Sequence, residues 1–256
     1  QLHRFDGTAV DQLLGSSISH AGDIDRDGLA DILVGSPNSN PNGQTSGSAF
    51  VYSGSDGLQI YRFDGASGAF RMGHAVAAAG DIDGDGWSDL LVSAPWAYPV
   101  SSSSDGAVYA YSGANGQEIL RLDGQEHGGL FGHSIARIGD LDGDQGAGFL
   151  VGAPYTINTS SSTNPGSAYL FSSSGILIHR FDAGVQDRHF GFSVSGAGDV
   201  DGDGLDDLLI GGPNSYPNGL VETGAAYVYS LAPFLYTDRT TLSPSGGPPI
   251  NLSLAF

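Results

Sequence analysis

The stretch "GDIDGDGWSD" occupies residues 80–89 and places four aspartates within ten residues. Carboxylates held this close repel one another, so the spacing indicates either a catalytic pair or a cation that gathers them. Similar stretches recur, namely "GDIDRDGLAD" at 22–31, "GDLDGDQGAG" at 139–148 and "GDVDGDGLDD" at 198–207. Their first aspartates lie 58, 59 and 59 residues apart, so the chain consists of four internal repeats.

Each repeat predicts four short β-strands. A segment such as "FGHSIARI" precedes the acidic stretch, and an apolar run such as "LLVSAP" follows it. After a variable loop come segments such as "GAVYAYSG" and "QEILRLDG", rich in β-branched and aromatic residues and bounded by turn-forming residues. Four-stranded units at a fixed period are typical of a β-propeller. The sequence therefore predicts an all-β propeller of four blades, with four antiparallel strands in each.

The two ends of the repeat array predict how the ring closes. The chain begins with "QLHRFDG", which matches a fourth strand, whereas the last repeat ends at its third strand, "GAAYVYS". We expect residues 1–6 to close the last blade, so that the propeller spans residues 1–230 without an exposed edge. Exchange of these strands between two chains, giving eight blades, is the alternative. Intramolecular closure is favoured by its higher effective concentration.

The tail, residues 231–256, breaks the repeat. We expect it to be a C-terminal strap or the start of a linker or assembly segment. Its last residues, "INLSLAF", alternate apolar and polar side chains like a half-buried strand. Such a strand could also join one propeller to the next by strand addition.

The acidic stretches predict calcium sites. Their spacing is D-x-D-x-D-G-x-x-D, which offers side-chain oxygens at positions 1, 3, 5 and 9 and a backbone carbonyl at position 7. Ca²⁺ takes six to eight oxygen ligands in flexible geometry, and the glycine permits the tight turn. The predicted ligands of three full sites are Asp23, Asp25, Asp27, Leu29 and Asp31; Asp81, Asp83, Asp85, Trp87 and Asp89; and Asp199, Asp201, Asp203, Leu205 and Asp207.

The third loop departs from this pattern. It keeps Asp140, Asp142 and Asp144, but Gln145 replaces the glycine and Gly148 stands where the fourth aspartate is expected. We expect a degenerate site there, which binds calcium more weakly or not at all.

Three rival interpretations fit the acidic loops less well. An EF-hand needs an acid at position 12, where this chain has Val34, Val92, Val151 and Ile210. A carboxylate pair can hydrolyse glycosides, but an enzyme normally needs one such site rather than four near-copies. Acidic turns without metal would leave the clustered charges uncompensated. With no G-x-S-x-G elbow present, we predict that the chain is not an enzyme.

The charge of the chain limits the classes of partner that it can bind directly. The chain has 28 acidic residues against nine basic ones, for a formal net charge of −19. This charge argues against nucleic acid or an anionic membrane as a direct partner. No apolar run approaches the length of a membrane span.

The repeats resemble FG-GAP repeats, the calcium-binding blades of the integrin α-subunit propeller and of many bacterial extracellular proteins. The eponymous elements are Phe131-Gly132 with Gly152-Ala153-Pro154, and Phe190-Gly191 with Gly211-Gly212-Pro213. The resemblance implies a secreted or cell-surface, calcium-stabilised, non-catalytic module for adhesion or assembly. Integrin propellers usually have seven blades, whereas this chain has four, so only the calcium positions are carried over.

The loops on the face opposite the acidic loops are the expected partner site, because recognition usually uses loops on a rigid scaffold. Four aromatic residues there could stack on a glycan or anchor a protein partner: Trp96, Tyr98, Tyr155 and Tyr216. Packing of these rings on the propeller rim is an equally good interpretation. Two alternative functions stay open: the chain is a carbohydrate-binding lectin, or it is a non-catalytic part of a larger extracellular hydrolase or lyase.

Overall fold

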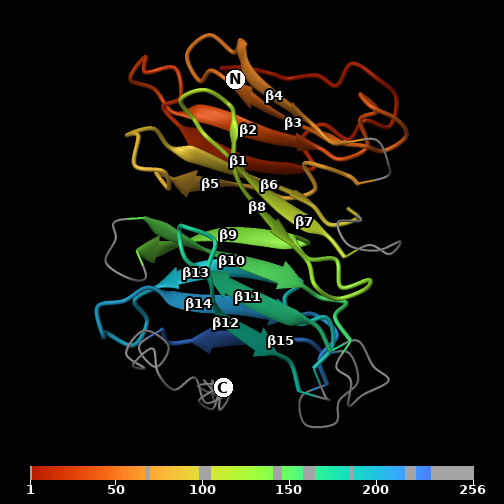
Figure 1. Ribbon diagram of the computed structural model, residues 1–256, viewed down its shortest axis with the longest axis vertical. Helices are drawn as coiled ribbons and strands as arrows, with labels where there is room; N and C mark the ends of the chain where they lie inside the picture. Colours follow the sequence, from red (N-terminus) through yellow and green to blue (C-terminus); the bar gives the residue numbers. More distant parts are fainter. Residues whose placement is uncertain are drawn as a thin grey trace.

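The computed structural model describes residues 2–66, 70–97, 105–140, 146–157, 165–184, 187–216 and 223–231. Within these ranges the regular structure consists of fifteen strands in four antiparallel sheets, with no helix (Figure 1). The prediction of an all-β propeller built from four repeated blades is confirmed.

Each sheet is a meander in which the order of the strands along the chain is their order in space. The first blade comprises β1 (Ser17–Gly22), β2 (Asp31–Ser36), β3 (Ser48–Tyr52) and β4 (Gln59–Asp64), and the second comprises β5 (Val76–Gly80), β6 (Asp89–Ala94), β7 (Ala107–Tyr111) and β8 (Glu118–Asp123). The third comprises β9 (Ser134–Asp140), β10 (Ala147–Ala153), β11 (Ser167–Phe171) and β12 (Leu177–Asp182), and the fourth comprises β13 (Ser193–Gly198), β14 (Asp207–Gly212) and β15 (Ala225–Tyr229).

The core lies between neighbouring sheets. Every residue of β6 and β10 is buried, because each of these strands has a sheet packed on both faces. Leu33 and Val51 of the first blade, for example, share one buried cluster with Leu90 and Val92 of the second. Full burial of one such side chain contributes roughly 1.5–3 kcal/mol, so contacts between blades supply much of the stability.

The FG and GAP elements meet where two blades join. In the fourth blade Gly191 has a φ of 83°, and its backbone N–H donates to the Gly211 carbonyl at 3.1 Å. A Cβ on Gly152 of the third blade would lie only 1.9 Å from the Gly191 carbonyl oxygen. The preceding residue, Phe190, is 1% exposed and fills the junction. Glycine is therefore required on both sides of the junction, on one side by dihedral angle and on the other by close approach.

The blades follow one another along the molecule. Consecutive first strands β1, β5, β9 and β13 contact each other, and Figure 1 shows β4 near one end and β15 near the other. The ring of Phe5 stacks on Tyr52 of the first blade at 4.2 Å, and His3 Nε2 donates to the Gly54 carbonyl at 3.0 Å. Among the described strand pairs β15 pairs with β14, so closure of this blade by residues 1–6 stays a prediction.

Residues 232–256 lie outside the described residues, as does almost all of the predicted strap or assembly segment. A search of the described part of the chain found no helix with the length and apolar character of a membrane span.

Candidate metal centres

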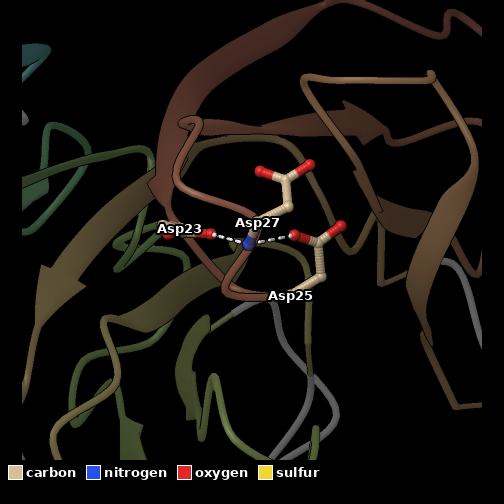
Figure 2. Close-up of side chains that lie close together, drawn as sticks. All are labelled: Asp23, Asp25 and Asp27. Carbon is tan, nitrogen blue, oxygen red and sulfur yellow. Dashed lines mark hydrogen bonds between the residues drawn. The ribbon is translucent and has the colours of Figure 1, made fainter.

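The acidic loops connect the first and second strands, and in the first, second and fourth blades their backbone N–H groups donate to the loop carboxylates. In the first loop the backbone N–H of Asp27 donates to Asp23 Oδ1 at 3.0 Å and to Asp25 Oδ1 at 3.2 Å (Figure 2). The equivalent N–H groups of Asp85 and Asp203 make the same two bonds, each at 3.1 Å. The spacing of the aspartates thus produces one local geometry three times.

The first three carboxylates of each loop converge. One oxygen from each lies within 4.8 Å of the others in the groups Asp23, Asp25 and Asp27; Asp81, Asp83 and Asp85; and Asp199, Asp201 and Asp203. Oxygens that share a Ca²⁺ ion at about 2.3–2.6 Å can be separated by at most about 5 Å. The three loops therefore have the donor chemistry and the spacing that a hard cation needs.

The fourth aspartate of each loop has a different environment. Asp89, the first residue of β6, is completely buried, with Oδ2 accepting from the Ile82 N–H at 2.8 Å and Oδ1 from the Gly113 N–H at 2.9 Å. Asp31 makes the equivalent bonds to Ile24 and Gly54. This carboxylate therefore ties the acidic loop to the turn between the third and fourth strands.

Burial governs the protonation of these fourth aspartates. Desolvation raises the pKa of Asp89 to about 6, although its two backbone hydrogen bonds oppose the rise. The pKa of Asp31 is raised for the same main reason. Metal ligation by these residues, and by the carbonyls of Leu29, Trp87 and Leu205, stays a prediction.

The last blade holds its fourth aspartate less completely. Oδ2 of Asp207 accepts from the Val200 N–H at 2.8 Å, but buried Oδ1 accepts no hydrogen bond among the described residues. Leu231 stands here where the first two blades have Gly54 and Gly113. One unsatisfied buried acceptor costs roughly 1–3 kcal/mol, so the acidic loop of this blade is held less firmly than those of the first two blades.

The third loop lies mostly outside the described residues. Asp140 ends β9, and Gly148 lies within β10, but Asp142, Asp144 and Gln145 are not described. The degenerate calcium site predicted for this blade stays a prediction.

A contact between the first two acidic loops was not predicted from the sequence. The Arg26 guanidinium carbon lies 3.2 Å from the ring centroid of Trp87, and Arg26 Nη2 donates to the Gly86 carbonyl at 3.3 Å. The sequence feature that could have indicated this contact is Arg26 itself, because position 4 of the other three acidic loops is glycine. A cation–π contact of this kind links two candidate metal centres directly.

On the opposite face, the aromatic residues proposed for partner binding pack against basic side chains. The Trp96 ring lies 4.5 Å from the Arg71 guanidinium and meets the edge of His74 at 5.0 Å. Tyr216 lies 4.8 Å from the Arg188 guanidinium, and Tyr155, also on this face, packs on the His189 ring at 4.7 Å. These three rings are half-buried, which fits packing on the rim and still leaves part of each ring accessible.

The fourth of these aromatic residues, Tyr98, lies outside the described residues.

Two histidines join the second and third blades on this face. The rings of His74 and His133 are 5.1 Å apart, and His133 Nδ1 lies 3.2 Å from the Phe192 carbonyl. Burial, reinforced by His133 and Arg71, lowers the pKa of His74 to about 4, and burial also lowers the pKa of His133. These rings are therefore neutral packing elements near neutral pH.

Comparison with known proteins identifies the repeats. The FG-GAP repeat family matches residues 14–52, 72–111 and 190–229, in register with three of the blades. The chain is an integrin-like FG-GAP repeat protein. Integrin alpha-V of Gallus gallus is 32% identical over 218 residues, and integrin alpha-5 of Xenopus laevis is 31% identical over 217 residues. Each alignment covers 78% of the FG-GAP protein but 20% of the relative, so the chain spans about a fifth of these relatives' length.

The solved structures found by comparison include one with low sequence identity to the FG-GAP protein. The structure described as BBS1N in complex with ARL6DN aligns with a TM-score of 0.48 at 12% identity, covering 84% of this chain and 47% of that one. A likeness of this size carries no argument about function. The third repeat, whose acidic loop is degenerate, is not among the ranges that match the FG-GAP family.

Proposed function

We propose that the FG-GAP protein is a calcium-stabilised, non-catalytic module that acts in extracellular adhesion or assembly. The observation that carries the proposal is the convergence of three carboxylates in each of three loops, at the same place in three blades. One acidic site in the same loop of three blades fits ions that stabilise each blade, whereas an enzyme normally has a single active site. Similarity to integrin α chains supports an adhesive role at the cell surface or in secreted form.

Calcium in this proposal neutralises the acidic clusters and fixes the loops. Each ion present at a hundredfold its dissociation constant would add roughly 2.7 kcal/mol to the free energy of unfolding. Thermal melts in calcium and in EGTA test the role, and isothermal titration calorimetry counts the ions. A midpoint that does not change on chelation would refute a structural role for calcium.

The degenerate third loop is tested with paired variants. Asp85→Ala should remove one bound ion, since it deletes one of the three converging carboxylates of the second loop. Asp144→Ala should lower the stoichiometry or affinity less, because that loop already lacks its glycine and fourth aspartate. Loss of one ion in both variants would mean that the third loop is a full site.

The partner in this proposal is a protein or a glycan that contacts the face opposite the acidic loops. Trp96→Ala and Tyr216→Ala, made separately, should weaken adhesion of protein-coated beads to a responsive cell line without changing the calcium count. A glycan array separates the two partner classes, and a saturable hit lost in both variants would favour the lectin alternative. Unchanged adhesion and no glycan hit would leave the loop rings with a packing role alone.

Self-assembly through residues 231–256 is part of the same proposal. Light scattering of the full chain and of a chain that ends at residue 230 tests it, at matched concentration and in calcium. A concentration-dependent mass that the truncation abolishes is the expected result, and equal masses would reject assembly through the tail.

A further inference from the structure

The junctions between blades differ in one respect. At three positions along the propeller an aromatic ring on one segment packs against an aromatic ring that ends the third strand of the next blade. The pairs are Phe5 with Tyr52 at 4.2 Å, Phe63 with Tyr111 at 4.1 Å, and Phe181 with Tyr229 at 4.8 Å. The junction between the second and third blades has Leu122 instead, at the register position of Phe63 and Phe181.

A cavity of about 380 Å³ lies at this junction. Its apolar lining includes Leu122 of β8, Phe131, and Tyr169 and Phe171 of β11. Phe131 is held edge-on to both β11 rings, with centroid distances of 5.5 and 5.9 Å. The volume falls in the range of small-molecule sites, roughly 300–1,000 Å³, and the aromatic walls are rigid. We call this cavity the junction pocket.

The charged lining of the junction pocket is mainly acidic. Asp105, Asp123 and Glu126 line it, with Arg121 as the basic residue of the lining. Arg121 Nε already donates to Asp123 Oδ1 at 2.7 Å. Outside the lining, Arg180 pairs with both Glu126 and Asp182. The carboxylates near the pocket therefore outnumber the guanidinium groups, which favours a cationic ligand over an anionic one.

Asp105 is the acid that distinguishes this junction. It is 2% exposed and precedes the glycine that opens the third strand. At the same position the other blades have Ser46, Pro165 and Thr223. Asp105 Oδ1 lies 3.3 Å from the His127 Nδ1 atom. A carboxylate buried beside an aromatic-lined cavity interacts strongly with a cation that enters, because little water screens the pair.

We propose that the junction pocket binds a small aromatic amine. The aromatic ring of the ligand occupies the place that a phenylalanine fills at the other junctions and packs on Phe131 and Phe171. The ammonium group lies toward Asp105. A planar ring matches the ring-lined wall, and a single positive charge matches the acidic lining. This site is separate from the acidic calcium loops and does not depend on the adhesive function.

The test uses phenethylamine as the probe and the full chain in calcium. Ligand-observed NMR and isothermal titration calorimetry should give saturable 1:1 binding with a Kd on the order of 1 mM, as expected for nine non-hydrogen atoms. The matched control ligand is 3-phenylpropanoate, which has the same ring and the opposite charge and should bind at least tenfold more weakly. Equal affinity for the two ligands, or no saturation with phenethylamine, would overturn the proposal.

Two variants locate the binding. Asp105→Asn keeps the shape of the side chain and should raise the Kd for phenethylamine at least tenfold. Leu122→Phe combined with Val108→Ala recreates the phenylalanine–alanine pair of the first and third blades, and should fill the pocket and abolish binding. Unchanged affinity in either folded variant would place the ligand elsewhere and reject the assignment. If the double variant does not fold, the Asp105→Asn result decides alone. Saturable binding of a methyl glycoside in place of phenethylamine would make the pocket a sugar site and also overturn the proposal.

Discussion

Asp89→Ala should destabilise the FG-GAP protein even when no calcium is present. The carboxylate is completely buried and accepts the backbone N–H groups of Ile82 and Gly113. Removing it leaves two buried donors unsatisfied, at roughly 1–3 kcal/mol each, so we expect a loss of about 4 kcal/mol. Asp83→Ala is the matched control, because exposed Asp83 accepts one bond within its own loop, from Asp85 N–H at 3.1 Å.

The assay is urea unfolding followed by circular dichroism at pH 7.5, in EGTA and again in calcium. Asp89→Ala should lower the free energy of unfolding in both buffers. Asp83→Ala should change it by less than about 0.5 kcal/mol in EGTA and lose the gain from one of the calcium ions. At this pH the wild-type Asp89 carboxyl is largely ionised, since its pKa is about 6. If Asp89→Ala matched the wild type in EGTA, its hydrogen bonds would contribute nothing and its role would be metal binding alone.

Three further predictions concern contacts between blades. In EGTA, the wild type should lose about 1–3 kcal/mol of unfolding free energy relative to His74→Gln as the pH drops from 6.5 to 4, because the lowered pKa of His74 means that the unfolded chain binds its proton first; the opposite contribution from the raised pKa of Asp89 is common to both proteins, and equal pH profiles would contradict the assignment. Arg26→Ala should cost about 0.5–2 kcal/mol through loss of the contact with Trp87, and a double-mutant cycle with Trp87→Ala that shows no coupling would refute the contact. Deleting residues 1–6 should remove the contact of Phe5 with Tyr52 and, because these residues are predicted to close the last blade, expose the edge of the blade at 190–230 and promote aggregation. An unchanged melting midpoint and monomeric light scattering would count against any structural role for this segment.

The repeat period determined most of the architecture. Because each blade needs strands of similar length joined by similar turns, a 58- or 59-residue period with alternating apolar segments specifies a four-stranded blade without knowledge of its neighbours. The convergence of Asp23, Asp25 and Asp27 was equally predictable, since alternate acids on one tight turn must approach each other. Loop geometry and strand pairing are local, so the spacing of residues along the chain encodes them.

Contacts between blades could only be decided by the tertiary structure. The contact of Arg26 with Trp87 and the cavity between Leu122 and Phe171 each involve residues about 50–60 positions apart. Their approach depends on the angle and separation of two packed sheets. The different environments of the aspartates within one acidic loop also depend on tertiary structure. Asp89 looks like its neighbours in sequence, but it starts a buried strand and faces a turn from the far side of its own sheet, whereas Asp83 stays exposed. Spacing determines which carboxylates gather, and packing of the sheets determines which of them lose contact with water.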